Sequence, residues 1–208
     1  MGLNIVSEAL KRKVLVKLVE NRIERQDYAN SLSVQQGINR DDTAFLIKHD
    51  GSWLHKGSLI TKKPMVCLFA SMLTRDAEGH YFLDSAFESV RIDVEDAPLI
   101  VVGMTWVGSG RKQKLNFITN TDQCITAGPD HGLRIASHFM RLEPVPYLHV
   151  RNGKGTFPIE ARFNRATYYE LMALAEPCVE RGEDVLGVWS SGVFFPVGHL
   201  SRKGAFLP

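Results

Sequence analysis

Residues 45–53 read FLIKHDGSW and place an Asp-Gly pair between two short apolar runs. Asp50-Gly51 favours the tight turn of a β-hairpin, because the central residues of such turns adopt positive φ angles that glycine tolerates. A similar stretch recurs at residues 147–155, YLHVRNGKG, with Asn152-Gly153 at the turn. The two stretches are related by a constant offset of 102 residues. The sequence therefore predicts two copies of one hairpin.

Each predicted hairpin is followed by an amphipathic helix. We expect Thr61 to cap the first helix, with Pro64 in its first turn, and Asn164 to cap the second. The apolar stripes of the two helices are Met65, Leu68, Phe69, Met72 and Leu73 in the first, and Tyr168, Leu171, Met172 and Ala175 in the second. An alternative is that two unrelated hairpin-and-helix units share this pattern by chance.

Strands are expected after each helix. Val90, Ile92 and Val94 alternate with charged residues, and residues 193–197 repeat this pattern at an offset of 103. Further strands are predicted at Leu99 to Val107, at Gln113 to Thr119 and at Cys124 to Ala127, the first two joined by a glycine-rich turn. An amphipathic helix is expected from Asn4 to Asp27.

Together these patterns predict an α+β fold: two similar units of mostly antiparallel strands with one packed helix each, plus an N-terminal helix. We expect the first domain, residues 1–98, to hold the N-terminal helix and the first copy. The larger second domain, residues 99–208, is expected to hold the second copy and the additional strands.

Composition excludes several classes of protein. The 208 residues are 44% hydrophobic and 23% charged, which is typical of a globular chain. With 25 Lys and Arg against 23 Asp and Glu, the net charge of +2 predicts no long polyanion as a partner. No apolar run approaches the roughly 18 residues of a membrane span, so no membrane partner is expected. Three scattered cysteines and no apparent signal peptide predict a cytoplasmic protein with reduced thiols.

Motifs of catalysis are missing from the sequence. There is no nucleophile elbow, zinc-protease motif, phosphate-binding loop or dinucleotide fingerprint. Gly108 to Lys112 resembles a phosphate cradle, but a strand follows it, so a hairpin turn is the better interpretation. The histidines form no pair with metal-ligand spacing. We therefore expect no metal and no cofactor, and a binding protein more than an enzyme.

One strand carries unusual chemistry. Tyr147, His149 and Arg151 stand at alternate positions, which predicts that all three share one face. An aromatic ring, an imidazole and a guanidinium could together stack a base and hold a phosphate or carboxylate. Arg165 and Tyr168, one helical turn apart, would extend this surface. The alternatives are a solvated outer face for the strand and a core position for Tyr168.

Two other places are candidate sites with alternative interpretations. Glu95-Asp96 at a strand end could act as a general base or pair with arginine, or could simply terminate the strand before Pro98. Trp189-Ser190 in a tight turn could form a shelf for a ligand or cover the core.

Four separated motifs carry a resemblance to a known family. They are DGSW at residues 50–53, RIDVEDAP at 91–98, YLHVR at 147–151 and GVWS at 187–190. In this order and spacing, they resemble the bacterial family of domain of unknown function 1285. The resemblance implies two domains with a duplicated motif, a second unit like the pleckstrin-homology fold, and a ligand site between the domains. It also implies a role in signal transduction with a nucleotide or nucleic-acid-like ligand.

Our hypothesis is a non-enzymatic sensor or adaptor that binds a small anionic, nucleotide-like ligand between its two units. Arg151 and Arg165 would hold the anion, while His149 and Asn120 would form hydrogen bonds to the ligand. Trp189 or Tyr168 would stack on it. The complete predicted set is Arg91, Asp96, Asn120, Tyr147, His149, Arg151, Arg165, Tyr168, Trp189 and Ser190. The alternatives are a protein-interaction module, with a protein partner or a second copy, and an enzyme that uses His149 or Asp96 as acid or base.

Overall fold

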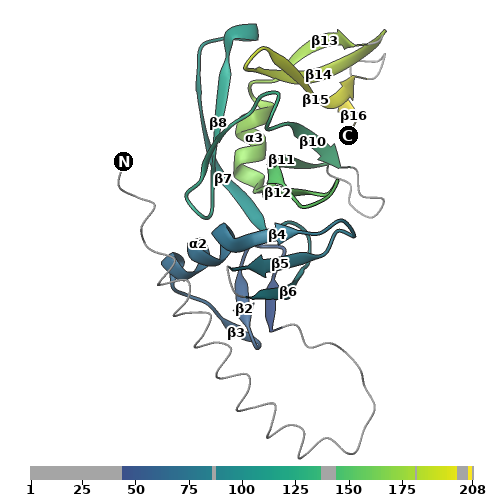
Figure 1. Cartoon of the computed structure of the whole chain (residues 1–208). Coiled ribbons are helices and arrows are strands. Elements are labelled where there is room, and N and C mark those ends of the chain that lie inside the picture. The colour runs from purple at the N-terminus through teal and green to yellow at the C-terminus, as the bar shows by residue number, and fades with distance from the viewer. Residues whose placement is uncertain (1–43, 86–87, 137–143, 181, 201–205, 208) are drawn as a thin grey trace, which may run out of the picture.

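The computed structural model describes residues 44–85, 88–136, 144–180, 182–200 and 206–207. They form two units that lie end to end, each built mostly of β-strands with one α-helix (Figure 1). This arrangement confirms the expected α+β architecture of two units. The helix expected from Asn4 to Asp27 lies outside the described residues, and the pleckstrin-homology likeness of the second unit stays a prediction.

The first unit is one curled sheet with a helix. Its sheet has the order β3-β2-β1-β6-β5-β4, and β1 pairs in parallel with β6. The predicted hairpin around Asp50-Gly51 is confirmed, since β1 and β2 pair antiparallel. The elements are β1 (Phe45–Ile47), β2 (Trp53–His55), β3 (Ser58–Leu59), α2 (Lys63–Met72), β4 (Leu73–Arg75), β5 (Tyr81–Asp84) and β6 (Ser89–Val94).

The second unit has a six-stranded sheet, in the order β10-β11-β12-β7-β8-β9, and a four-stranded sheet, in the order β13-β14-β15-β16. In the larger sheet β12 pairs in parallel with β7. The elements are β7 (Leu99–Val107), η1 (Gly110–Lys112), β8 (Lys114–Thr119), β9 (Cys124–Thr126), β10 (Leu133–Ala136), β11 (Val145–Asn152), β12 (Pro158–Phe163), α3 (Arg165–Met172), β13 (Glu176–Glu180), β14 (Glu183–Ser190), β15 (Val193–Leu200) and β16 (Phe206–Leu207).

The two helices begin in different ways. The side chain of Asn164 accepts a hydrogen bond of 2.8 Å from the backbone N–H of Thr167, which confirms the predicted cap of α3. The cap predicted at Thr61 is wrong, because the N-cap of α2 is Lys62 and no side chain caps it. Pro64 lies in the first turn of α2 as expected, where its missing N–H costs nothing.

Leu73 does not belong to the helix. The predicted apolar stripe of α2 included it, but the helix ends at Met72 and Leu73 begins β4. No glycine or proline marks this change, so the helical spacing of the apolar residues runs on into the strand. Strands β10 and β13 were also not predicted.

The order of elements repeats between the units, but the pairing of strands does not. A hairpin, a helix and an antiparallel set of strands follow one another in both halves. In the first unit, β6 returns to pair with β1. In the second unit, β10 and β12 flank β11, and the strands after α3 form a separate sheet. The two units therefore share the order of their elements, as the predicted duplication requires, but they do not share the pairing of their strands.

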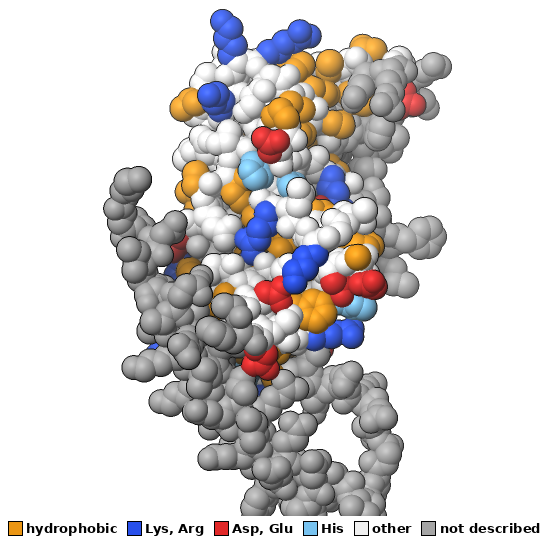
Figure 2. All heavy atoms as spheres, in the orientation of Figure 1, with side chains coloured by type: hydrophobic (Ala, Val, Ile, Leu, Met, Phe, Trp, Pro, Cys, Tyr) orange, Lys and Arg blue, Asp and Glu red, His pale blue; other side chains and the backbone are white. Residues whose placement is uncertain are grey.

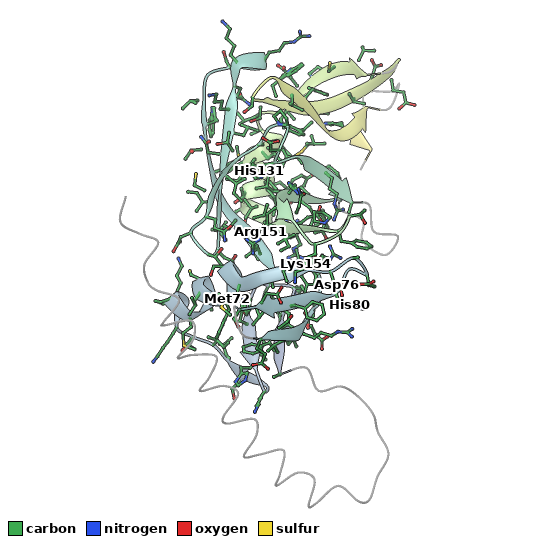
Figure 3. The ribbon with its side chains drawn as sticks, in the orientation of Figure 1. Met72, Asp76, His80, His131, Arg151 and Lys154 are labelled. Atoms are coloured by element: carbon green, nitrogen blue, oxygen red, sulfur yellow. The ribbon has the colours of Figure 1, made fainter. Side chains whose placement is uncertain are left out.

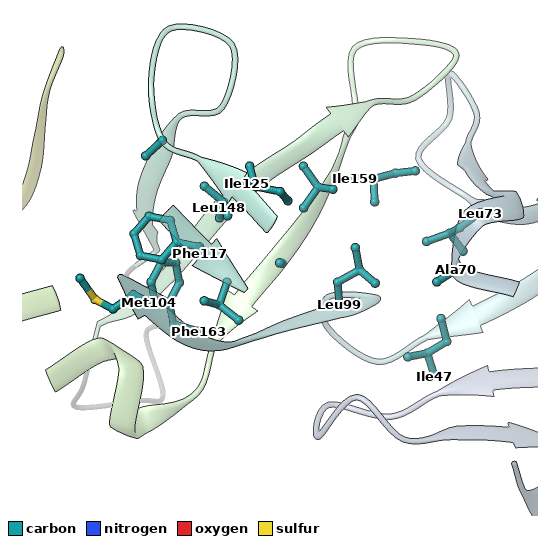
Figure 4. Packing of buried hydrophobic residues seen from close by; sticks show 14 of the residues in the cluster. Ile47, Ala70, Leu73, Leu99, Met104, Phe117, Ile125, Leu148, Ile159 and Phe163 are labelled. Atoms are coloured by element: carbon teal, nitrogen blue, oxygen red, sulfur yellow. The ribbon is translucent and has the colours of Figure 1, made fainter. Parts of the chain in front are cut away.

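One hydrophobic core runs through both units. It joins Ile47, Ala70 and Leu73 of the first unit to Leu99 and Ile159 of the second (Figure 4). Ile47, Leu99 and Ile159 are fully buried. The boundary between the units is therefore a packed region of the protein.

Candidate functional site

A cleft of about 420 Å³ lies where the two units meet. Both units and the connection between them line it: Arg75, Tyr81, Asp96, Ala97, Arg134, Tyr147, Phe157, Pro158 and Glu160. Acidic, basic and histidine side chains gather on the surface over this boundary (Figure 2). The cleft therefore combines aromatic rings with charged groups of both signs.

Arg75, at the end of β4, is fixed by contacts with both units. Its Nε donates to the carbonyl oxygen of Gly79 at 2.9 Å, and its Nη1 donates to the carbonyl oxygen of Pro158 at 2.9 Å. Its guanidinium lies 4.6 Å from the ring centre of Tyr81 and 4.9 Å from that of Phe157. Within the described part of the chain, no carboxylate forms an ion pair with Arg75. Two carbonyl oxygens and the faces of two aromatic rings stabilise its positive charge instead.

Arg134, on β10, is paired with an acid. Its Nε and Nη2 donate to the two carboxylate oxygens of Glu160, both at 2.6 Å. Its guanidinium also lies 4.2 Å from the ring centre of Tyr147. The Arg134 side chain is 52% exposed although that of Glu160 is only 12% exposed, so the arginine faces the solvent side of the pair. This two-pronged pairing fixes the plane of the guanidinium.

A buried phenol lies beside these arginines. The hydroxyl of Tyr147 donates to Oδ1 of Asp96 at 2.7 Å, and Nη1 of Arg162 donates to Oδ2 of the same carboxylate at 3.3 Å. Burial, and then the hydrogen bond to Asp96, raise the pKa of Tyr147 well above its usual value. Burial likewise raises the pKa of Tyr81. Both phenols therefore stay neutral and can donate hydrogen bonds.

The charges around the cleft favour an anion. Three guanidinium groups, those of Arg75, Arg134 and Arg162, face two carboxylates, those of Asp96 and Glu160. The Nε of Arg162 is buried and has no hydrogen-bond partner among the described residues. No group of His, Cys, Asp or Glu that could hold a metal ion occurs within the described ranges. The same ranges contain no helix long and apolar enough to cross a bilayer.

The β11–β12 turn forms one wall of this region and packs on the β4–β5 turn of the first unit. The backbone N–H of Lys154 donates to the carbonyl oxygen of Arg75 at 2.6 Å, and its Nζ pairs with Asp84 at 2.5 Å. Lys154 lies close to the β4–β5 turn in Figure 3. A Cβ at Gly155 would lie 2.6 Å from the Cα of Ala77. The contact requires glycine at this position because two backbones meet there.

Two family models match the chain in succession. The first, domain of unknown function (DUF1285), N-terminal domain, matches residues 38–97. The second, protein of unknown function (DUF1285), C-terminal domain, matches residues 98–197. The chain belongs to the DUF1285 family.

Solved structures of DUF1285 proteins resemble this chain. A DUF1285 family protein from Silicibacter pomeroyi DSS-3 is 35% identical, with a TM-score of 0.66, over 81% of this chain and 92% of its own. Another from Shewanella baltica OS155 is 25% identical, with a TM-score of 0.48, over 63% of this chain and 91% of its own. No curated protein matches the chain. The family likeness predicted from the four motifs is confirmed.

Two of the ten predicted site residues line the cleft of this DUF1285 protein, Asp96 and Tyr147. The expectation that Tyr147, His149 and Arg151 share a face is wrong for Arg151, whereas Tyr147 and His149 keep regular pairing and lie on one face. The pairing of β11 with β12 shifts so that His149 lies opposite Glu160 while Arg151 lies opposite Ile159. This β-bulge moves Arg151 to the core face, away from Tyr147.

His149 and Arg151 have other partners. Nδ1 of His149 lies 2.7 Å from the carbonyl oxygen of Asp130, and its Nε2 lies 3.0 Å from Oδ1 of Asn152. Nη2 of Arg151 donates to the carbonyl oxygens of Ala70 and Leu73, each at 2.8 Å. Arg151 therefore connects the second unit to the end of α2.

The other predicted residues lie outside the cleft. Arg91 is exposed on β6, and Asn120 accepts a hydrogen bond of 3.0 Å from the N–H of Ile100. Arg165 donates to the hydroxyl of Tyr169 at 2.9 Å, and the rings of Tyr168 and Tyr169 stack. Trp189 and Ser190, predicted to form a ligand shelf or to cover the core, do not line the cleft. Arg111 lies 4.9 Å from the Trp189 ring centre. The fully buried Ser190 donates to the carbonyl oxygen of Ala127 at 2.7 Å.

Sequence reasoning missed most of the cleft. The residues it did not find are Arg75, Tyr81, Ala97, Arg134, Phe157, Pro158 and Glu160. Arg75 ends β4, a strand that follows α2 without any helix-breaking residue between them. Arg134 lies on β10, which the sequence did not predict. Glu160 alternates with buried residues in a predicted strand. This alternation could have indicated that its carboxylate points away from the core.

Proposed function

We propose that this DUF1285 protein is a non-enzymatic sensor that binds a small anionic, nucleotide-like ligand in the cleft between its units. The observation that carries the proposal is Arg75, a guanidinium that lines the cleft without a carboxylate partner in the described part of the chain. A guanidinium binds phosphate or carboxylate through parallel hydrogen bonds. Nη2 of Arg75 forms no hydrogen bond within that part, so it can donate to a ligand.

Aromatic rings favour a ligand with a planar group beside its anion. Phe157 lines the cleft and is 40% exposed, which is unusual for a phenylalanine in a packed boundary. Tyr81 has no hydrogen bond from its hydroxyl to any described residue, so this phenol can donate to the ligand. Stacking on such rings contributes roughly 1–3 kcal/mol per nucleobase. A nucleotide offers both the ring and the anion.

Acid–base catalysis is less well supported by the same geometry. Both carboxylate oxygens of Asp96 already accept hydrogen bonds, from Tyr147 and Arg162. His149, the other candidate, lies outside the lining of the cleft. Binding is therefore the function that the contacts support best, and signalling would follow from a response to the bound ligand.

Calorimetric titration of the full chain tests the proposal. The panel is inorganic phosphate, pyrophosphate, adenosine monophosphate and guanosine monophosphate. We expect saturable binding of at least one nucleotide. Phe157→Ala should weaken that binding by about tenfold, because a lost stacking contact of about 1.4 kcal/mol changes the dissociation constant by that factor.

Tyr81→Phe provides a second, milder test, since it removes a hydroxyl without changing the ring. Tyr169→Phe is its control, because Tyr169 is 52% exposed on α3, outside the cleft. We expect weaker binding in the first variant and unchanged binding in the second. Absence of binding across the panel, or equal binding by wild type and Phe157→Ala, would overturn the proposed site.

A further inference from the structure

Arg75 lines the cleft and also contacts the second unit. Its side chain lines the cleft and stacks on a ring from each unit, Tyr81 from the first and Phe157 from the second. Its Nη1 and its carbonyl oxygen both bond to the second unit, through Pro158 and Lys154. A ligand that binds Arg75 in the cleft therefore binds the same residue that connects the β4–β5 turn to the β11–β12 turn.

The junction is the contact between the β11–β12 turn, residues 153–155, and the β4–β5 segment, residues 75–79. Across it, the backbone N–H of Lys154 donates to the Arg75 carbonyl, and beside it the Lys154 side chain forms an ion pair with Asp84 at the end of β5. In that ion pair, the lysine side chain is 64% exposed and that of the aspartate 26% exposed. Ion pairs this close to solvent are weaker than buried ones, so we expect the junction to open locally at a lower free-energy cost than the fully buried core shared by the two units.

We propose that ligand binding in the cleft and closure of this junction are coupled through Arg75, so that the junction is the element that reports the bound ligand. This inference rests on the proposed function. The walls of the cleft come from both units, so a ligand makes more contacts when the junction is closed than when it is open. A ligand shifts an equilibrium by its difference in affinity for the two states. The coupling is reciprocal, so opening the junction must weaken binding.

Amide exchange in wild-type protein measures the coupling directly. The Lys154 amide donates across the junction, and the Ala127 amide, which donates to Leu115 within the second unit, is the internal control. In NMR exchange experiments with saturating adenosine monophosphate, and separately with pyrophosphate, we expect exchange at Lys154 to slow roughly fivefold or more. Exchange at Ala127 should change little. Saturable binding with unchanged exchange at Lys154 would overturn the coupling and leave the proposed function standing.

Two alanine variants test the reverse direction. Gly155→Ala places a Cβ 2.6 Å from the Cα of Ala77, which pushes the two turns apart. Gly103→Ala is the matched control, because a Cβ there has no atom within 4 Å. We expect Gly155→Ala to weaken binding of the same probes roughly fivefold and Gly103→Ala to leave it unchanged. Equal affinities in both variants would contradict the coupling, whereas no binding by wild type would overturn the proposed function itself.

Discussion

Arg151, in the second unit, caps the C-terminal end of helix α2 in the first unit. Its guanidinium donates to two carbonyl oxygens, those of Ala70 and Leu73, in the last turn and the cap of the helix. The Ala70 carbonyl also accepts from the backbone N–H of Leu73, and the helix dipole favours a positive charge beside these carbonyls. Arg151 is half-buried, and this burial lowers the pKa of its guanidinium.

Arg151→Met should destabilise the protein. The change leaves two carbonyl oxygens without their charged donor, and such hydrogen bonds contribute about 2 kcal/mol. Urea unfolding followed by circular dichroism should show this loss. Arg91→Met, at an exposed position on β6, is the control and should change the free energy of unfolding by less than about 0.5 kcal/mol. Equal stabilities for the two variants would show that Arg151 does not hold the units together.

The β1–β2 hairpin depends on the fit of its turn. Gly51 has a φ of 83°, and a Cβ there would lie 2.6 Å from Cγ1 of Ile100 and 2.8 Å from Nδ2 of Asn120. Gly57, in the next turn, has a φ of 77° but open space around it. The two glycines share their backbone conformation and differ in their surroundings.

Alanine at these two positions should therefore separate backbone strain from packing. Gly57→Ala should cost about 1 kcal/mol, the strain of a left-handed residue. Gly51→Ala should cost about 1–3 kcal/mol more, because the added methyl group overlaps the second unit. Thermal unfolding of both variants measures the difference. If they melt at the same temperature, the contact of this turn with Ile100 and Asn120 contributes nothing.

Element patterns explain which parts of the fold were predictable. The alternation in β6, the apolar run of β7 and the asparagine cap of α3 all appear in the local sequence. The change from α2 to β4 does not, because tertiary pairing ends that helix without a breaking residue. The bulge in β11 was equally hidden, since no glycine marks its position between His149 and Arg151. That bulge moved Arg151 away from the predicted site, and the cleft residues come together through long-range pairing.

The contact between the two units should depend on pH through Asp84, which pairs with Lys154. Burial alone would raise the pKa of this carboxyl, but hydrogen bonds from Lys154 and Ser89 outweigh it, so the pKa lies below its usual value. A carboxylate with a lowered folded pKa stabilises the protein above its unfolded pKa of about 3.9. That stabilisation is lost as the pH falls through the folded pKa.

Asp84→Asn should remove this part of the acid sensitivity. Urea unfolding of wild type and variant, repeated from neutral pH to roughly pH 3, should show that wild type loses more stability below about pH 4 than the variant does. Glu88→Gln, near the same strand but without an ion pair in the described part of the chain, is the control. Parallel pH curves for wild type and Asp84→Asn would contradict the assignment.

The two parallel strand pairs, β1–β6 and β7–β12, also determine when each sheet can form during translation. The first unit closes its sheet when β6 joins β1, so that pairing can form as soon as residues up to Val94 have left the ribosome. Strand β7 comes next, but its parallel partner β12 ends only at Phe163. A nascent chain therefore holds the paired strands of the first unit beside an unpaired edge of β7 until β12 has been made. Contacts this distant form slowly, and until β12 arrives the unpaired edge of β7 can pair wrongly with another chain.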